Sequence, residues 1–186
     1  MYAKLINMQS VKEIQKQAYK LMSKDFSYKN ALQAPRLVKI IIAVGTGSGM
    51  KRDRNRNDLV IDRLAKITGQ KPTIRPAKKS IASFKIREGD PVGVMVTLRE
   101  ARMLAFMDKF IHIALPRTKD FRGLDPKSID DIGNVTFAIR EHTIFPEAAD
   151  EDLKDVFGMS LTIVTTAKTK AEAKAFLEVL GIPFKK

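Results

Sequence analysis

The chain has 186 residues, 44% of them apolar, with 34 lysines and arginines against 21 acidic residues. This composition predicts a single domain with one hydrophobic core over residues 1–186. No apolar run approaches the ~20 residues that a membrane span needs. Residues 1–10 lack the pattern of a signal peptide, and cysteine is absent, which excludes disulfides and thiolate metal sites. We therefore expect a cytoplasmic protein.

The net charge of +13 is unevenly distributed along the chain. Residues 1–117 contain 24 basic and 9 acidic residues, whereas residues 118–186 contain 10 basic and 12 acidic ones. Nucleic acid is the leading candidate partner for the first part, because lysine and arginine neutralise phosphates. An anionic membrane surface would require a strongly amphipathic basic helix, and the helices that we expect are ordinary core-facing ones. An inert basic surface is the simplest alternative.

The N-terminal half is predicted to contain two helices around a buried strand. Apolar residues at three- and four-residue steps predict a helix over Val11–Met22, within an N-terminal helical region of residues 1–24. A strand rich in valine and isoleucine is expected over Leu37–Val44. A second helix over about Asn57–Thr68 should stop at Gly69. We interpret a stripe of lysines on the first helix as a solvated face: Lys12, Lys16, Lys20 and Lys24.

The middle of the chain is predicted to form strands and a long helix. Pro72–Arg87 is interpreted as two strands flanking a basic turn. Val92–Arg99 alternates with the period of a half-buried strand. Ala101–Leu115 is predicted to be a helix that ends at Pro116.

The last third is predicted to begin with a long loop over residues 117–134, which is unusual in a compact domain and typical of a functional segment. Two further strands are expected over Val135–Ile139 and Met159–Thr165. Thr169 and Glu172 form the pattern of a capping box before the last helix. Mixed helices and strands joined by short turns indicate an α+β fold, with a mainly antiparallel sheet, helices on one face and the other face open to a partner.

Enzyme motifs are incomplete in this sequence. Gly45 and Gly47 begin a glycine-rich turn, but Met50 stands where phosphate-binding loops and dinucleotide fingerprints require glycine. The turn is therefore either a plain connector or a flexible loop that approaches an RNA phosphate. The two histidines, His112 and His142, lack zinc-site spacing, and an acidic cluster after residue 146 lacks the calcium-loop pattern. We expect no catalytic residue, metal or cofactor.

Several motifs in a fixed order are more specific. They are Gly69–Pro72, Ala77–Gly89, Val96–Arg99, Leu115–Leu124, Ile144–Glu147 and Thr162–Lys168. Together they closely resemble the family of bacterial large-subunit ribosomal protein five, the 5S-rRNA-binding protein of the central protuberance. The resemblance runs from about Ser27 to Phe184, nearly the whole chain.

The resemblance implies a single α+β domain whose open, concave sheet face holds a loop of 5S rRNA. The matching positions are Gln70, Phe84 and Thr97. An amide and a hydroxyl can bond base edges or 2′-hydroxyls, and an aromatic ring can pack on a base or ribose. The residues alone would favour a core position for Phe84, and the resemblance favours an RNA contact instead.

The resemblance also implies further partners. The basic turn matches a projecting loop that approaches P-site tRNA, here with Arg75, Lys78 and Lys79. The loop over residues 117–133 matches a region that contacts a small-subunit protein at an intersubunit bridge. Candidate contacts to phosphates of the large-subunit rRNA are Lys51, Arg52, Arg54 and Arg56.

The sequence departs from the family pattern at Ala43, where members usually carry asparagine. The missing amide could be replaced by Thr46, Ser48 or the arginines beyond. Our leading interpretation is a structural ribosomal protein, bound to the ribosome in the cytoplasm. The alternatives are a free-standing RNA-binding regulator or chaperone, and a phosphate-handling enzyme that uses the glycine turn.

Overall fold

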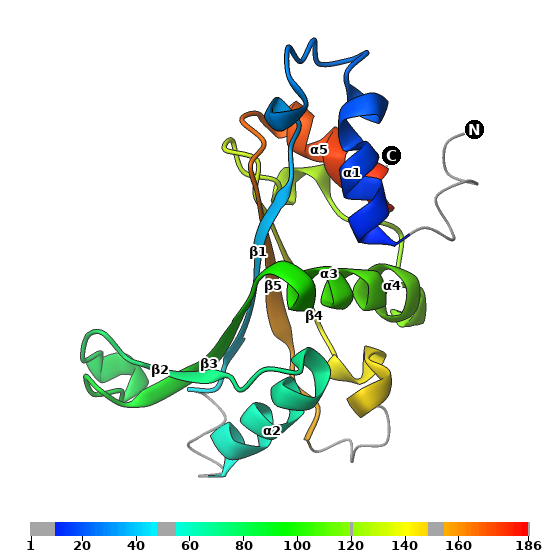
Figure 1. The fold of residues 1–186 in the computed structure, drawn as a ribbon. Coiled ribbons are helices and arrows are strands. Elements are labelled where there is room, and N and C mark those ends of the chain that lie inside the picture. The colour runs from blue at the N-terminus through cyan, green and yellow to red at the C-terminus, as the bar shows by residue number, and fades with distance from the viewer. Residues whose placement is uncertain (1–9, 48–54, 120, 149–154, 186) are drawn as a thin grey trace. The chain divides into compact units, whose positions relative to one another are not determined.

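The computed structural model describes residues 10–47, 55–119, 121–148 and 155–185. The chain falls into two compact units (Figure 1). Unit 1 comprises Met1–Ile40, Arg99–Phe137 and Thr162–Lys186, and unit 2 comprises Ile41–Leu98 and Ala138–Leu161. The expectation of a single domain stays a prediction. Within the described residues, no helix is long and apolar enough to cross a membrane.

Five strands form one open antiparallel sheet in the order β2-β3-β1-β5-β4. Their bounds are Leu37–Gly45 (β1), Thr73–Pro76 (β2), Pro91–Leu98 (β3), Val135–Ile139 (β4) and Met159–Thr165 (β5). Along β1, β3 and β5, fully buried side chains largely alternate with half-exposed ones, as expected for strands with one face on a core. The predicted α+β fold is confirmed.

Three longer helices lie in the described part of unit 1. They are Val11–Met22 (α1), Glu100–Lys109 (α3) and Lys170–Val179 (α5). The first packs against the other two, and the Val11 amide donates a hydrogen bond of 2.7 Å to Asp108 Oδ1. The predicted bounds of α1 are confirmed.

The start of α5 matches the predicted capping box only in part. The Thr169 hydroxyl accepts a hydrogen bond from the Glu172 amide at 3.3 Å, as expected for an N-cap. The Glu172 carboxylate accepts instead from the Lys168 amide at 2.7 Å and from the Tyr28 hydroxyl at 2.6 Å. This carboxylate therefore ties residue 28 to the start of a helix at the other end of the sequence.

The predicted end of the long helix at Leu115 is wrong. After α3 the helix continues through a π-helical turn, Phe110–Ala114, and a last turn, Leu115–Arg117 (α4). Pro116 has no amide to donate, and its ring would clash with the carbonyl four residues earlier in a regular helix. The wider π turn accommodates the proline, and the Leu115 amide accordingly donates to the Phe110 carbonyl, five residues back.

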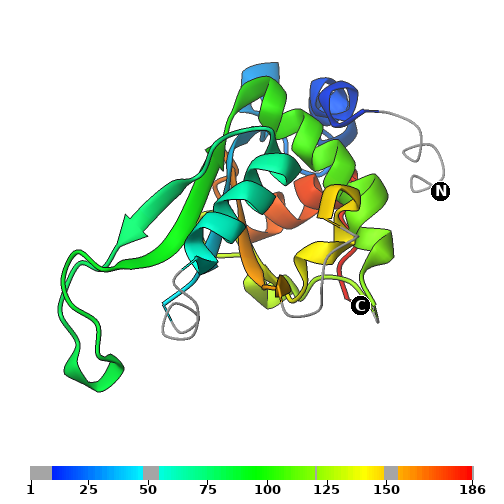
Figure 2. The same cartoon turned by 90° about the horizontal axis from the view of Figure 1, so that it is seen from below.

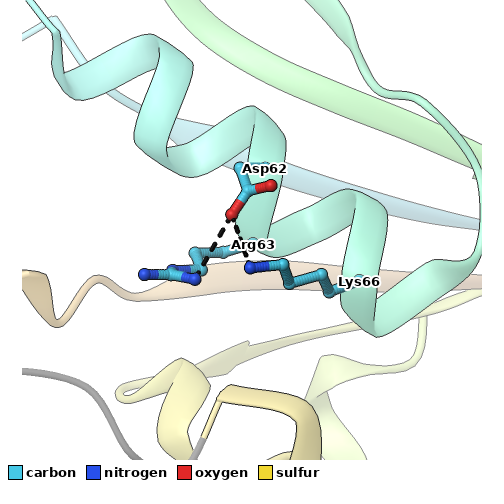
Figure 3. Close-up of polar contacts among 3 residues, drawn as sticks. All are labelled: Asp62, Arg63 and Lys66. Atoms are coloured by element: carbon cyan, nitrogen blue, oxygen red, sulfur yellow. Dashed lines mark hydrogen bonds and ion pairs between the residues drawn. The ribbon is translucent and has the colours of Figure 1, made fainter.

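Unit 2 is built around helix α2, Arg56–Thr68, which packs against β3. The helix ends at Gly69, whose φ of 66° lies in the left-handed region that glycine adopts without strain. On its surface, Asp62 pairs with Lys66 at 2.9 Å and with Arg63 at 3.2 Å (Figure 3). The hydrogen bond and charge of Lys66, with the charge of Arg63, hold the pKa of Asp62 below its ordinary value.

The prediction of two strands within Pro72–Arg87 is half wrong. The first strand, β2, pairs with β3, with Thr73 opposite Met95 and a register shift between Arg75 and Pro76. The expected second strand is reduced to one bridge between Ile81 and Ile86, around a 3-10 turn at Ala82–Phe84. Residues 77–90 are thus the loop of the β2–β3 hairpin.

Candidate nucleic-acid interface

Gln70 is fixed in place by the end of α2. The buried Thr68 hydroxyl donates to the Leu64 carbonyl at 2.6 Å and lies 3.1 Å from the Gln70 carbonyl. The Gln70 side chain then donates from Nε2 to the Thr97 carbonyl at 3.1 Å. The sequence Thr-Gly-Gln therefore turns the chain out of the helix and aims a side-chain amide at strand β3.

Thr97 lies on the side of β3 that faces away from the core. Its neighbours Val96 and Leu98 are buried, whereas Met95 and Thr97 are half-exposed. The Thr97 hydroxyl has no hydrogen-bond partner in the part of the chain that the structure describes. Two of the three predicted 5S-binding residues thus lie together, at the base of the hairpin.

The third predicted residue, Phe84, lies elsewhere in unit 2. It belongs to the 3-10 turn of the hairpin loop, and its side chain is 61% exposed. The Ile81–Ile86 bridge around this turn lies eight residues beyond Thr73, on the far side of β2 from Gln70. Phe84 is therefore an exposed residue of the hairpin loop, whereas Gln70 lies at the base of the hairpin.

Phe84 shares the loop with two of the predicted tRNA-contacting lysines. Lys78 and Lys79 are exposed, and Arg75 is exposed at the end of β2. In both views the β2–β3 hairpin and its loop extend beyond the rest of unit 2 (Figure 1, Figure 2). The structure thus groups an aromatic ring with three cations on one projecting hairpin.

The hairpin loop has internal hydrogen bonds of its own. The Ala77 amide donates to the Asp90 carbonyl at 2.8 Å, and the Gly89 amide donates to the Ala77 carbonyl at 3.0 Å. The Ser80 hydroxyl accepts from the Glu88 amide at 2.9 Å. These bonds continue the hairpin toward its tip and set the direction in which the basic side chains project.

Of the four residues predicted to contact rRNA phosphates, only Arg56 lies in the described part of the chain. Lys51, Arg52 and Arg54 lie outside the described residues, as does Ser48. Arg56 is half-buried, and its Nη2 donates to the Val156 carbonyl at 3.1 Å. This contact gives Arg56 a structural role between α2 and the residues that precede β5.

Ala43, where family members usually carry asparagine, contacts Ser160 through its backbone. The Ala43 carbonyl accepts a hydrogen bond from the Ser160 hydroxyl at 3.2 Å. Thr46 is only 3% exposed, and its hydroxyl has no partner within the described residues. Thr46 is therefore too deeply buried to present its hydroxyl at the surface in place of the missing amide.

The two histidines have different environments. His142 is fully buried and stacks on Phe157, with ring centroids 3.9 Å apart, while its Nδ1 accepts from the Phe157 amide at 3.3 Å. This core position could not be predicted from the sequence, because the two preceding residues, Arg140 and Glu141, are charged. His112 is exposed. Among the residues described, no three histidines or carboxylates form a metal-binding group.

An α+β fold with an open sheet and exposed cations on a projecting hairpin is typical of a protein that binds nucleic acid. Comparison with known proteins identifies the family. Residues 30–87 match the model described as Ribosomal protein L5, and residues 91–184 match that of the ribosomal L5P family C-terminus. The chain belongs to the ribosomal protein L5 family.

Curated relatives support this assignment over nearly the full length. The chain is 49% identical over 178 residues to the large ribosomal subunit protein uL5 of Thermotoga sp. (strain RQ2), covering 94% of each chain. It is 48% identical over 163 residues to the protein of the same name from Carboxydothermus hydrogenoformans, covering 88% of this chain and 90% of that one. The corresponding protein of Acaryochloris marina is 47% identical over 164 residues. The chain is therefore a structural constituent of the large ribosomal subunit and not an enzyme.

Proposed function

We propose that this chain binds 5S rRNA through the face of unit 2 that presents Gln70 and Thr97, and so helps to attach 5S rRNA to the large-subunit rRNA. Membership of the family makes the chain a ribosome-bound protein of the cytoplasm. The observation that carries the proposal is the Thr97 hydroxyl, half-exposed and without a partner in the described part of the chain, beside an amide held by a hydrogen bond. Such a pair suits a 2′-hydroxyl or a base edge.

The hairpin loop is proposed to contact P-site tRNA. Lys78, Lys79 and Arg75 supply charge for a phosphate backbone, which gives affinity without base readout. Phe84, on the same loop, is exposed and can pack on a base or ribose. Because Phe84 lies on the loop and not beside Gln70, we propose that it contacts the RNA that meets the hairpin.

The long loop after α4 is proposed to contact a small-subunit protein at an intersubunit bridge. It is anchored by the buried side chains of Leu124 and Ile129. Its outer part presents Ile132, 68% exposed, next to the carboxylates of Asp130 and Asp131. An exposed apolar side chain among acidic groups suits a protein partner better than an RNA phosphate.

The experiment that tests the proposed function is a titration of the purified protein with 5S rRNA and with tRNA at several salt concentrations. Tighter binding to 5S rRNA, with selectivity that persists as salt rises, is the expected result. Equal affinities that fall together would indicate charge-driven binding alone. That outcome, in a protein absent from isolated ribosomes, would favour a free-standing RNA regulator or chaperone.

A further inference from the structure

Helix α1 of unit 1 presents a row of lysines on the side opposite its core face. Its buried residues are Val11, Ile14, Ala18 and Met22. At 3.6 residues per turn, the middle of the lysine row points about half a turn away from this buried stripe. The row is exposed and consists of Lys12, Lys16 and Lys20, continued by Lys24 just beyond the helix.

Two lysines on other helices, unlike these, each pair with a carboxylate four residues away. On α2, Lys66 pairs with Asp62 four residues earlier, and on α5, Lys174 pairs with Glu178 four residues later. None of the four lysines in the row forms an ion pair with any described residue. Glu13, three residues before Lys16, accepts from the Ser10 amide in a capping box, and Asp25 follows Lys24 beyond the helix.

The arrangement costs helix stability. Residues four apart on a helix are neighbours, and like charges at that spacing repel. Lys16 therefore faces a positive charge on both sides, from Lys12 and from Lys20. A solvated face has no need of such a row, and alternating acids would stabilise the helix. A polyanion bound along the row would relieve the repulsion.

We propose that the outward face of α1 binds the phosphate backbone of a double-helical RNA segment, separately from the 5S site of unit 2. Successive lysines advance about 6 Å along the helix axis, a spacing that suits repeated contacts along a nucleic-acid strand. The row itself contains no aromatic side chain on which unpaired bases could stack. The apolar face of α1 packs against α3 and α5, so it is not available for insertion into a lipid bilayer.

The test uses the full chain and three variants. Lys12→Gln, Lys16→Gln and Lys20→Gln are combined in the first. The control combines Lys127→Gln, Lys170→Gln and Lys185→Gln, which are exposed in the same unit and remove the same charge. A third variant replaces the α1 lysines with arginine. The probes are an RNA duplex of about 20 base pairs, long enough for a shape-directed site, and 5S rRNA.

The first variant is expected to bind the duplex at least about tenfold more weakly at low salt, with the salt slope reduced by about 2 to 3, one unit per lost phosphate contact. The control should change by less than about twofold, and the arginine variant should bind like the parent. The first variant should melt no lower than the parent, because its substitutions remove like-charge repulsion.

Equal losses in the first variant and in the control would overturn the proposal, since they would show a response to net charge alone. So would an unchanged duplex affinity, or equally strong α1-dependent binding to phosphatidylserine–phosphatidylcholine vesicles. The first variant should retain 5S rRNA binding, whereas Gln70→Ala should show the opposite pattern. These opposite binding patterns distinguish a wrong assignment of the 5S site from a wrong assignment of the α1 site.

Discussion

Reversing the charge of Lys78 and Lys79 separates the two RNA contacts proposed for unit 2. Both lysines are exposed on the hairpin loop, beyond the last residue of β2. We predict that Lys78→Glu combined with Lys79→Glu weakens tRNA binding and leaves 5S rRNA binding nearly unchanged. Two lost phosphate contacts should lower the salt slope for tRNA by about 2 and the affinity by tenfold or more.

The small effect on 5S rRNA follows from distance and screening. The strand from Thr73, at the base of the hairpin, to Pro76 spans about 10 Å, and Lys78 and Lys79 follow beyond it. The Debye length at physiological salt is about 8 Å. The reversed charges are therefore largely screened at the site of Thr97, which predicts a change of less than about twofold.

Two assays check this prediction. Binding of free 5S rRNA is titrated with the purified protein, and dissociation of tRNA from the P site is measured on ribosomes that carry the variant. Lys127→Glu combined with Lys185→Glu makes the same change in net charge at exposed positions of unit 1 and serves as the control. A collapse of 5S binding in the hairpin variant alone would refute the separate assignment of the loop.

Three further predictions concern unit 2 and the contact between Tyr28 and α5. Gln70→Ala or Thr97→Val should weaken 5S rRNA binding by about 1–3 kcal/mol in the same titration, the usual cost of leaving a polar partner unpaired; unchanged affinity would remove either residue from the site. Thr46→Val should raise the free energy of unfolding in urea by about 1 kcal/mol, because it removes a buried hydroxyl without a partner in the described residues, and a loss of 5S affinity instead would give that hydroxyl a role in binding. Burial, together with the hydrogen bond to and the charge of Glu172, raises the pKa of Tyr28 above its ordinary value of 10.0, so the neutral phenol stabilises the fold below that pH. Stability should therefore fall as pH rises above 10.0 toward the raised value, more steeply in the parent than in Tyr28→Phe, and parallel curves would contradict the role of this contact.

Most helices and strands could be predicted because local patterns determine them. The bounds of α1 follow from its apolar spacing, and α2 ends where Gly69 adopts the left-handed conformation. The two errors arose where the local pattern was insufficient. Apolar and charged side chains alternate from Phe84 to Arg87, but β3 already pairs with β2. Pro116 is an ordinary stop signal, and only the π turn before it allows the helix to continue.

The candidate site was less predictable than the fold. The basic character of the hairpin loop was visible in Lys78 and Lys79, but its geometry was not. The exposure of Phe84 depends on its position in a turn beyond the paired strands, because an aromatic residue is otherwise expected in a core. The link from Gln70 to the Thr97 carbonyl joins residues 27 apart in sequence, so no local pattern could indicate it.

The edge strand β2 bears on how the free protein behaves before it meets RNA. An unpaired strand edge is a template on which a second chain can add a strand, and this leads to aggregation. Here the edge is four residues long, its register shifts between Arg75 and Pro76, and the proline cannot donate to an incoming strand. Positive charges follow immediately, at Lys78 and Lys79. The same cations proposed to attract tRNA would therefore also keep two copies of the chain from joining edge to edge.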